Sequence, residues 1–193
     1  DYGFDYYAPQ SFEAEDGRRI HISWMGMPDC EEYTNPTIKD GWQHCFTFPR
    51  EVFVKDGKVC QKPVRELNAK KQQLQDVQNE LTQSGCPVYE VNVDGIKENH
   101  FQAVLSDELI LDYENGRFQM HFTNKSKASV STGRSLRYAK VDTLENVKIL
   151  ADTSSVEVFV NDGEFVFSTR YYPNDYKIVV HSPNAHITFN KIQ

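Results

Sequence analysis

Short runs of alternating apolar and polar residues follow one another along the first sixty positions, with turn-forming residues between them. A period of two with breaks at Asp, Gly and Pro is typical of antiparallel strands. The pattern predicts strands over residues 20–25, 43–48, 51–55 and 58–61. Asp56-Gly57 separates the last two, and an Asp-Gly pair between two strands is a strong signal for a hairpin.

A second region with the same alternation begins near residue 88 and runs to the end of the chain. Its clearest hairpin joins residues 156–160 to residues 164–168 through Asn161-Asp162-Gly163. Further strands are expected around 88–93, 118–122, 176–180 and 186–189. Roughly eight to ten short strands at even spacing, without helices between them, predict an antiparallel β-sandwich.

The segment between these regions has a different period. Pro63 opens it, and Leu67, Leu74, Val77 and Leu81 fall on one face of a helix. The spacing predicts an amphipathic connector helix over 63–81 whose apolar stripe lies against the junction of the two sheets. Two heptads are too few for a coiled coil.

Composition and charge exclude several classes of partner. The 193 residues carry a net charge of −7 without a Lys/Arg block, so nucleic acid is not expected as a partner. There is no apolar run of about eighteen residues, so no membrane span is expected. The first residues, Asp1 to Asp5, include no Met, basic start or apolar stretch, and we therefore expect an internal cut that hides any targeting signal.

Four cysteines, Cys30, Cys45, Cys60 and Cys86, are far apart and form no C-x-x-C pair. Their spacing does not favour a zinc site, and neither a metal nor a cofactor is expected. Their even number permits disulfides, but buried free thiols fit such a sparse set better and favour a reducing, cytoplasmic location.

Familiar catalytic patterns are missing. The sequence has no Gly-x-Ser-x-Gly elbow and no Gly-rich phosphate loop. His21 and His44 lie in strand-like runs, where a histidine is usually bonded within a sheet. Asn124-Lys125-Ser126 fits the pattern for N-glycosylation, which has no effect in a cytosolic protein.

The opening segment is the best candidate for binding. Carboxylates that accept hydroxyl hydrogens, beside flat aromatic rings, are what a carbohydrate pocket needs. The residues of this kind are Asp1, Asp5, Tyr6, Tyr7 and Gln10, with Trp24 and Trp42 further along. Aromatic residues in strands also serve as core, so composition leaves both interpretations open.

Several stretches resemble glycoside hydrolase family 32. Residues 1–12 resemble its aspartate-x-glycine-x-aspartate-aromatic-tyrosine-alanine-x-glutamine segment, and residues 41–51 resemble its last propeller strand with a proline-arginine-glutamate exit. Residues 18–29, 62–67 and 154–163 are similar to further family segments, in family order.

The resemblance implies an all-β fold: part of a five-bladed β-propeller (the fifth blade) followed by an antiparallel β-sandwich, with a short connector helix. The implied division is a blade at 1–60, a connector at 61–85 and the sandwich at 86–193.

Family members hydrolyse β-fructofuranosides with retention through two carboxylates, a nucleophile and an acid/base, while a second aspartate stabilises the transition state. The motifs that carry these residues contain Asn-Asp-Pro, Arg-Asp-Pro and Glu-Cys, and none occurs here. The resemblance therefore implies the C-terminal portion of a β-fructofuranosidase acting on sucrose, sucrose-6-phosphate or short fructans, and the segment alone is expected to be inactive. No catalytic residue is assigned.

The matched segment implies that Asp1 and Tyr7 contact substrate, with Asp5 and Trp24 as further candidates. A structural position between blades is the alternative for each of them. Two other functions remain open for the chain: a sandwich that binds carbohydrate by itself, and one that braces the propeller or mediates oligomerisation. A single blade would expose sheet edges, and self-association through blade or sandwich edges is expected.

Overall fold

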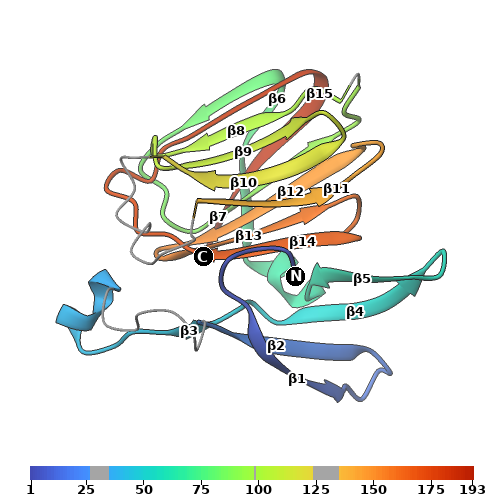
Figure 1. The fold of residues 1–193 in the computed structure, drawn as a ribbon, viewed down its shortest axis with the longest axis vertical. Helices are drawn as coiled ribbons and strands as arrows, with labels where there is room; N and C mark the ends of the chain where they lie inside the picture. Colours follow the sequence, from blue (N-terminus) through green and yellow to red (C-terminus); the bar gives the residue numbers. More distant parts are fainter. Residues whose placement is uncertain (27–34, 98, 124–134) are drawn as a thin grey trace.

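A computed structural model describes residues 1–26, 35–97, 99–123 and 135–193, and it consists of two antiparallel sheets. The larger sheet lies above the smaller one in Figure 1, and the chain begins between them. Cys30 and the Asn124-Lys125-Ser126 pattern lie outside the described residues. In the part of the chain that the structure describes, no helix is both long and apolar enough to cross a lipid bilayer.

The smaller sheet has the layout of one propeller blade. Its strands are β1 (Tyr7–Glu13), β2 (Arg19–Met25), β3 (Cys45–Phe46), β4 (Arg50–Lys55) and β5 (Lys58–Pro63). The order is β1-β2-β4-β5, and β3 pairs with the end of β2 that β4 leaves free. Pro49 separates β3 from β4, because it has no N–H to give to a ladder. β3 and β4 therefore share one position beside β2, and the sheet is four strands wide, as propeller blades are.

The predicted hairpin at Asp56-Gly57 is confirmed. Lys55 pairs with Lys58, which leaves a two-residue turn in which both residues have positive φ, 51° and 75°. Such turns match the twist of the strands they join. The short helix η2 (Pro36–Asp40) precedes β3.

The larger sheet contains ten strands and forms the predicted sandwich. Its strands are β6 (Lys71–Gln83), β7 (Tyr89–Asp94), β8 (Gln102–Leu105), β9 (Leu109–Glu114), β10 (Arg117–Phe122), β11 (Leu136–Lys140), β12 (Asn146–Asp152), β13 (Ser155–Val160), β14 (Phe165–Arg170) and β15 (Ile178–Ile192). The order is β11-β10-β9-β8-β15-β7-β12-β13-β14.

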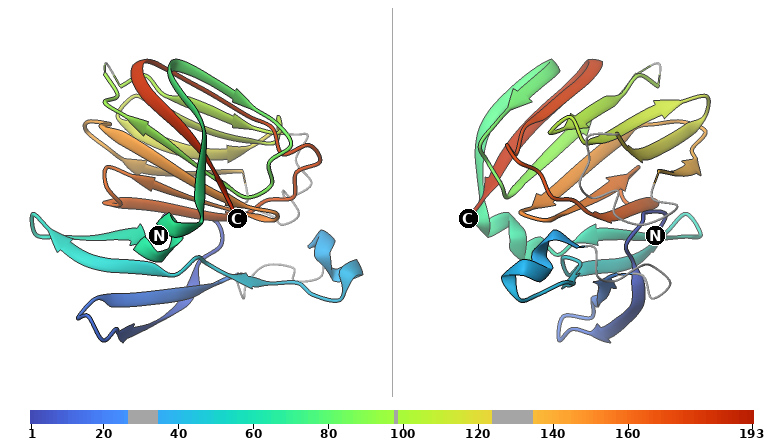
Figure 2. Two further views of the ribbon diagram at one scale, coloured as in Figure 1. Left: turned by 180° about the vertical axis from the view of Figure 1, so that it is seen from behind. Right: turned by 60° about the vertical axis from the view of Figure 1, so that its left-hand side comes forward.

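Strand β15 connects the two layers. Its first residues, 178–181, pair with β8, and its later residues, 186–191, pair with β7. The sheet therefore folds over along this strand, and Figure 2 shows the two layers facing each other. Apolar side chains such as Leu111, Phe118 and Phe167 fill the space between them and are fully buried.

The amphipathic helix expected over 63–81 is wrong beyond Lys70. Only η3 (Arg65–Lys70) is helical, in 3-10 form, and the rest of the segment is strand β6. β6 pairs with β15 along nearly its whole length, with shifts in register opposite residues 182–186 and 189–190. Leu81 is buried, whereas Leu74 is 45% exposed, so the four apolar residues do not share one face. Pairing with a strand a hundred residues away in sequence thus overrides the helical spacing.

The sheets divide between residues 63 and 71, because β6 belongs to the larger one. The domain limits at residues 60 and 86, which the family resemblance implies, stay predictions. The last residue, Gln193, donates its backbone N–H to Lys70 (2.9 Å), so the end of the chain lies against η3.

Candidate functional site

Three aromatic side chains form an edge on the smaller sheet, which we call the aromatic edge: Tyr7, Trp24 and His44. Tyr7 pairs with Trp24 across β1 and β2, and their rings meet edge to face at 6.1 Å. The His44 ring also meets Trp24 edge to face, with ring centroids 4.7 Å apart. Tyr7 is 47% exposed, which leaves ring surface for a ligand.

A bulge directs Tyr7. The register of β1 shifts between Tyr7 and Gln10, and Ala8 has φ of 47°, a left-handed value that a non-glycine residue rarely adopts. Bulges of this kind re-aim side chains and are frequent beside active sites. The aromatic edge is therefore held in place by backbone geometry as well as by ring contacts.

Asp5 points away from this edge. Its carboxylate accepts hydrogen bonds from the backbone N–H of Arg170 (2.7 Å) and from the Thr169 hydroxyl (3.3 Å), both on β14, and the residue is 4% exposed. β14 is the last strand in the order of the larger sheet, so the backbone N–H groups on its outer side have no strand to bond to. The Asp5 carboxylate supplies the acceptor for one of them.

Asp1 binds the edge of β14 in the same way, at Ser168, two residues before Arg170. One oxygen accepts the N–H of Ser168 (3.0 Å), and the other accepts the Ser168 hydroxyl (2.6 Å) and a bond from Arg50 (3.1 Å). The Asp1 side chain is fully buried. Between the two aspartates, Gly3 lies so close that an added Cβ would stand 2.1 Å from the Ser168 carbonyl oxygen. Only glycine fits there.

Arg50 is the centre of a buried polar group that we call the Arg50 cluster: Asp1, Arg50, Gln61, Glu157 and Ser168. The guanidinium donates through Nε and Nη2 to Glu157 (2.7 and 2.5 Å), through Nη2 to Ser168 (2.5 Å), and through Nη1 to Gln61 (2.9 Å) and Asp1. All five donors of the guanidinium are used. The cluster ties β4 and β5 of the blade to β13 and β14 of the sandwich.

Glu157 is the partner of Arg50 and is also fully buried. Its second oxygen accepts the backbone N–H of Phe48 (2.6 Å). Burial raises the pKa of the Glu157 carboxyl, and the Arg50 charge opposes that shift. The pair is thus a structural ion pair whose members depend on each other.

The three buried carboxylates described above are therefore engaged in holding the sheets together. Asp1 and Glu157 are bound to Arg50, and Asp5 is bound to β14. Burial and the Arg50 charge lower the pKa of His21 to about 4, so its imidazole is neutral near pH 7. Among the described residues, His, Cys, Asp and Glu form no group that could hold a metal ion. The aromatic edge can stack against a sugar ring, but the residues that the structure describes do not assemble a nucleophile and an acid beside it.

A second close contact joins the sheets at the β13–β14 turn. An added Cβ at Gly163 would lie 1.6 Å from the carbonyl oxygen of Gln61, and the Gln61 N–H donates to the Gly163 carbonyl (3.0 Å). Lys55 and Asp162 form an exposed ion pair nearby (2.8 Å).

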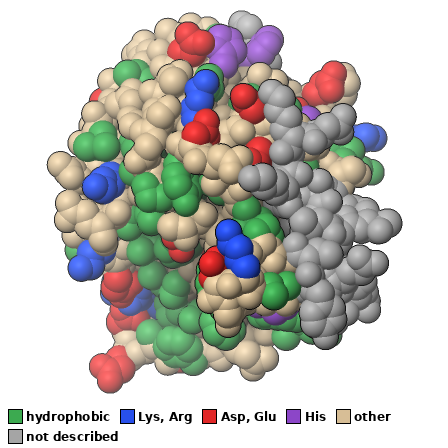
Figure 3. Space-filling model, turned by 90° about the vertical axis from the view of Figure 1, so that its left-hand side faces the viewer, with side chains coloured by type: hydrophobic (Ala, Val, Ile, Leu, Met, Phe, Trp, Pro, Cys, Tyr) green, Lys and Arg blue, Asp and Glu red, His purple; other side chains and the backbone are tan. Residues whose placement is uncertain are grey.

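The smaller sheet exposes apolar surface. Phe12 is 57%, Phe46 71% and Val54 72% exposed, and every residue of β1 is exposed. Figure 3 shows hydrophobic side chains over the lower half of one side of the molecule, where the smaller sheet lies. Apolar surface of this kind marks a contact site.

Family models match both parts of the chain. The model described as "Glycosyl hydrolases family 32 N-terminal domain" matches residues 1–63, and the model described as "Glycosyl hydrolases family 32 C terminal" matches residues 101–193. The chain belongs to glycosyl hydrolase family 32. In this family 32 chain the first match covers the whole smaller sheet and the second covers β8 to β15 of the larger sheet, which supports the predicted combination of propeller blade and sandwich.

Curated relatives agree with this assignment. The chain is 37% identical over 186 residues to a raffinose invertase of Escherichia coli, with 90% of this chain and 38% of the relative covered. It is 33% identical over 181 residues to the sucrose-6-phosphate hydrolase of Bacillus subtilis, with 90% and 37% covered. The family 32 chain thus spans less than two fifths of the length of these relatives.

Among solved structures, the sucrose-6-phosphate hydrolase from Lactobacillus gasseri superposes with a TM-score of 0.87 at 24% identity, over 100% of this chain and 42% of that one. At this identity the likeness shows the fold alone, and it confirms the predicted all-β class.

The substrate contacts expected at Asp1, Asp5, Tyr7 and Trp24 stay predictions. The structure brings Tyr7 and Trp24 together and places both aspartates against β14 instead. Sequence reasoning missed Arg50 and Glu157. A signal was available for Glu157, because it is the one charged residue in β13 and every residue of that strand is buried.

Proposed function

We propose that the chain supplies one wall of the sugar site, and the sandwich that supports it, in a retaining β-fructofuranosidase acting on sucrose or sucrose-6-phosphate. The observation that carries the proposal is the match of both family 32 models in order along the chain. The names of the relatives, an invertase and several sucrose-6-phosphate hydrolases, point to sucrose and its phosphate as substrates. Short fructans are further candidate substrates.

Within this role, the aromatic edge is the part that meets the sugar. Tyr7 is half exposed, and its ring is braced by Trp24 (6.1 Å). Ring faces of this kind pack against the apolar face of a sugar, while hydroxyls on the sugar find polar partners. We propose that the two reacting carboxylates come from sequence outside these 193 residues.

The first test is an assay of the chain alone with sucrose, sucrose-6-phosphate and inulin. We expect no release of glucose or fructose, because loss of the nucleophile and the acid removes the covalent route and costs many orders of magnitude in rate. Robust turnover by the 193-residue chain would contradict the proposed division of labour.

The second test asks for a gain of activity. The chain is fused behind the part of the Bacillus subtilis sucrose-6-phosphate hydrolase that it does not match. We expect the chimera to hydrolyse its substrate, and Tyr7→Ala to raise KM in it. Phe12→Ala, an exposed aromatic residue on the same strand, is the matched control. A folded chimera without activity, or equal changes in KM from Tyr7→Ala and Phe12→Ala, would contradict the proposal that Tyr7 contacts the sugar.

A structural role for the exposed surface is a second proposal. Val54, Phe46 and Phe12 are largely exposed on the smaller sheet, and β1 is an open edge strand. We propose that the isolated chain associates with itself through this sheet, and that the protein acts in the cytoplasm without nucleic-acid or membrane partners. Light scattering over a range of concentrations tests the association, and a strictly monomeric chain would refute it.

A further inference from the structure

Two lysines share one buried glutamate in the larger sheet. Glu90 lies on β7 and is 1% exposed. The Nζ of Lys71, at the start of β6, stands 2.7 Å from the Glu90 carboxylate, and the Nζ of Lys148, on β12, stands 3.3 Å from it. One negative charge thus faces two positive charges, and Lys71 is the closer partner.

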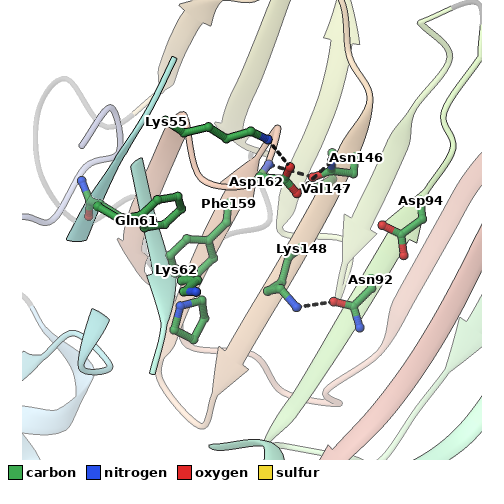
Figure 4. Close-up of a pocket in the computed structure, with 12 residues that line it drawn as sticks. Lys55, Gln61, Lys62, Asn92, Asp94, Asn146, Val147, Lys148, Phe159 and Asp162 are labelled. Carbon is green, nitrogen blue, oxygen red and sulfur yellow. Dashed lines mark hydrogen bonds and ion pairs between the residues drawn. The ribbon is translucent and has the colours of Figure 1, made fainter. Parts of the chain in front are cut away.

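The amine of Lys148 is also held by a side-chain amide. It donates to the Asn92 carbonyl oxygen (2.5 Å), and the Asn92 amide donates to Glu90 and Thr188 (both 3.1 Å). Figure 4 shows Lys148 and Asn92 joined in this way across the neighbouring strands β12 and β7. The position of the Lys148 amine is therefore fixed by side chains of the adjacent strands.

Lys148 remains within reach of a small molecule. Its side chain is 32% exposed, whereas that of Lys71 is 17% exposed. Lys148 lines a pocket of about 480 Å³ between strands β4 and β5 of the blade and strands β7, β12 and β13 of the sandwich, and Asp94, at the end of β7, lines it too. Pockets of about 300–1,000 Å³ admit small molecules. Lys148 is thus the more accessible of the two amines that share Glu90.

Other lysines nearby lack this combination of a shared carboxylate and burial. Lys55 and Lys58 each pair with a carboxylate, and their side chains are 52% and 58% exposed. Lys62 contacts a carboxylate that Arg18 also binds, but its side chain is 53% exposed, so water solvates its charge. These lysines therefore serve as internal references for Lys148.

The same surroundings decide how much of each amine is uncharged. Burial lowers the pKa of the Lys148 ammonium, the Glu90 charge opposes this shift, and the Lys71 charge adds to it. Hydrogen bonds to carboxylates instead raise the pKa of Lys55 and of Lys58. Only an uncharged amine is a nucleophile, and burial and a neighbouring cation are the means by which enzymes activate lysines.

We propose that Lys148 is a site of acylation by small activated acyl groups, carried as acyl phosphates or acyl thioesters. The uncharged Nζ attacks the carbonyl carbon of the donor, and the bond from that carbon to the phosphate oxygen or the thiol sulfur breaks. Phosphate or thiolate leaves with the bonding electrons, and the nitrogen gives up one proton to water. The product is an uncharged amide, so Glu90 stays paired with Lys71 alone.

Acylation thus removes the surplus positive charge without leaving the buried carboxylate unpaired. A buried carboxylate that lost its partner would be strongly destabilising. The site lies outside the aromatic edge, and its modification goes beyond the proposed function and does not depend on it.

The folded 193-residue chain is incubated at neutral pH with acetyl phosphate and, in parallel, with acetyl-coenzyme A. Mass spectrometry of its peptides gives the initial rate of acetylation at each lysine. We expect Lys148 to react severalfold faster than Lys55 and Lys58 with at least one donor, and that donor identifies the source of the acyl group. Equal or slower reaction of Lys148 with both donors would overturn the proposal. So would the same preference in urea, because the cause would then lie in local sequence.

The variant Lys71→Met tests the shared carboxylate. Without the second ammonium, Glu90 pairs with Lys148 alone, so acetylation of Lys148 should slow severalfold. Lys70→Met is the matched control, because Lys70 is the adjacent residue and is exposed. Glu90→Gln removes the charge that opposes the shift and should speed the reaction. With the variants folded by circular dichroism, equal rates in Lys71→Met and Lys70→Met, or slower reaction in Glu90→Gln, would overturn the proposal.

Discussion

Replacing Arg50 by methionine removes the centre of the buried cluster between the two sheets. Glu157 would keep only the Phe48 N–H as a partner, and Asp1 would keep only the Ser168 and Gly3 groups. Leaving one member of a buried ion pair without its partner typically costs about 3–5 kcal/mol. Because both side chains here are fully buried, we expect Arg50→Met to lower the free energy of unfolding by about that amount.

A second substitution separates the charge from the packing. Glu157→Gln keeps an oxygen for the Phe48 N–H but removes the charge. The double variant Arg50→Met/Glu157→Gln should therefore recover about 1 kcal/mol or more of the loss. The difference in free energy of unfolding between Arg50→Met and the unmodified chain should also become smaller as pH falls, because the unpaired Glu157 carboxyl then takes up a proton.

Urea unfolding of the 193-residue chain, followed by circular dichroism, gives these free energies by linear extrapolation. Lys55→Met is the matched control, because it breaks an exposed ion pair across the same junction and should leave stability unchanged. The reasoning fails if Arg50→Met is as stable as the unmodified chain, or if the double variant is less stable than Arg50→Met.

Other expected results concern single groups. Gly163→Ala should lose about 2 kcal/mol more free energy of unfolding than Gly116→Ala in urea unfolding. Both glycines have positive φ, but only at Gly163 would the added Cβ meet a backbone atom within 4 Å, and equal losses would contradict this. The pKa of His21 falls to about 4 in the folded chain, so its contribution to stability should be complete above about pH 6.5. The free energy of unfolding should drop by about 3 kcal/mol as pH falls from 6.5 to 4, and a His21→Asn variant should lose this dependence. Burial raises the pKa of the Cys60 and Cys86 thiols, so both should resist a disulfide reagent until urea unfolds the chain; fast reaction of the native chain would contradict their burial.

Local patterns predicted strands at β2 to β5, β7, β10 and β13 to β15, because a strand with one buried face shows its period in its own residues; β1, β8, β9, β11 and β12 were not among the predicted ranges. Both Asp-Gly hairpins are present, and each has positive φ at the turn residues. Strand β6 was missed because its partner is β15, and nothing within residues 71–83 encodes that pairing. Gln is the commonest residue of the segment, and it is compatible with either a helix or an edge strand.

The same limit applies to the site. The opening segment suggested a sugar pocket because acidic and aromatic residues alternate there, yet a carboxylate that binds sugar and one that closes a sheet edge look alike in sequence. Distinguishing them requires knowing that the edge of β14 lies alongside, with the N–H groups of Ser168 and Arg170 open to acceptors.

The edge of β14 also links the two sheets to the aromatic edge. Asp5 is bound to Arg170, and Tyr7 follows only two residues later, at the start of β1. The segment between them is too short to absorb a displacement, since two extended residues span only about 7 Å. Any movement of the sandwich relative to the blade would therefore shift Tyr7. On this argument the sandwich contributes to the proposed sugar wall by fixing the position of that ring, although no residue of β14 lies in the aromatic edge itself.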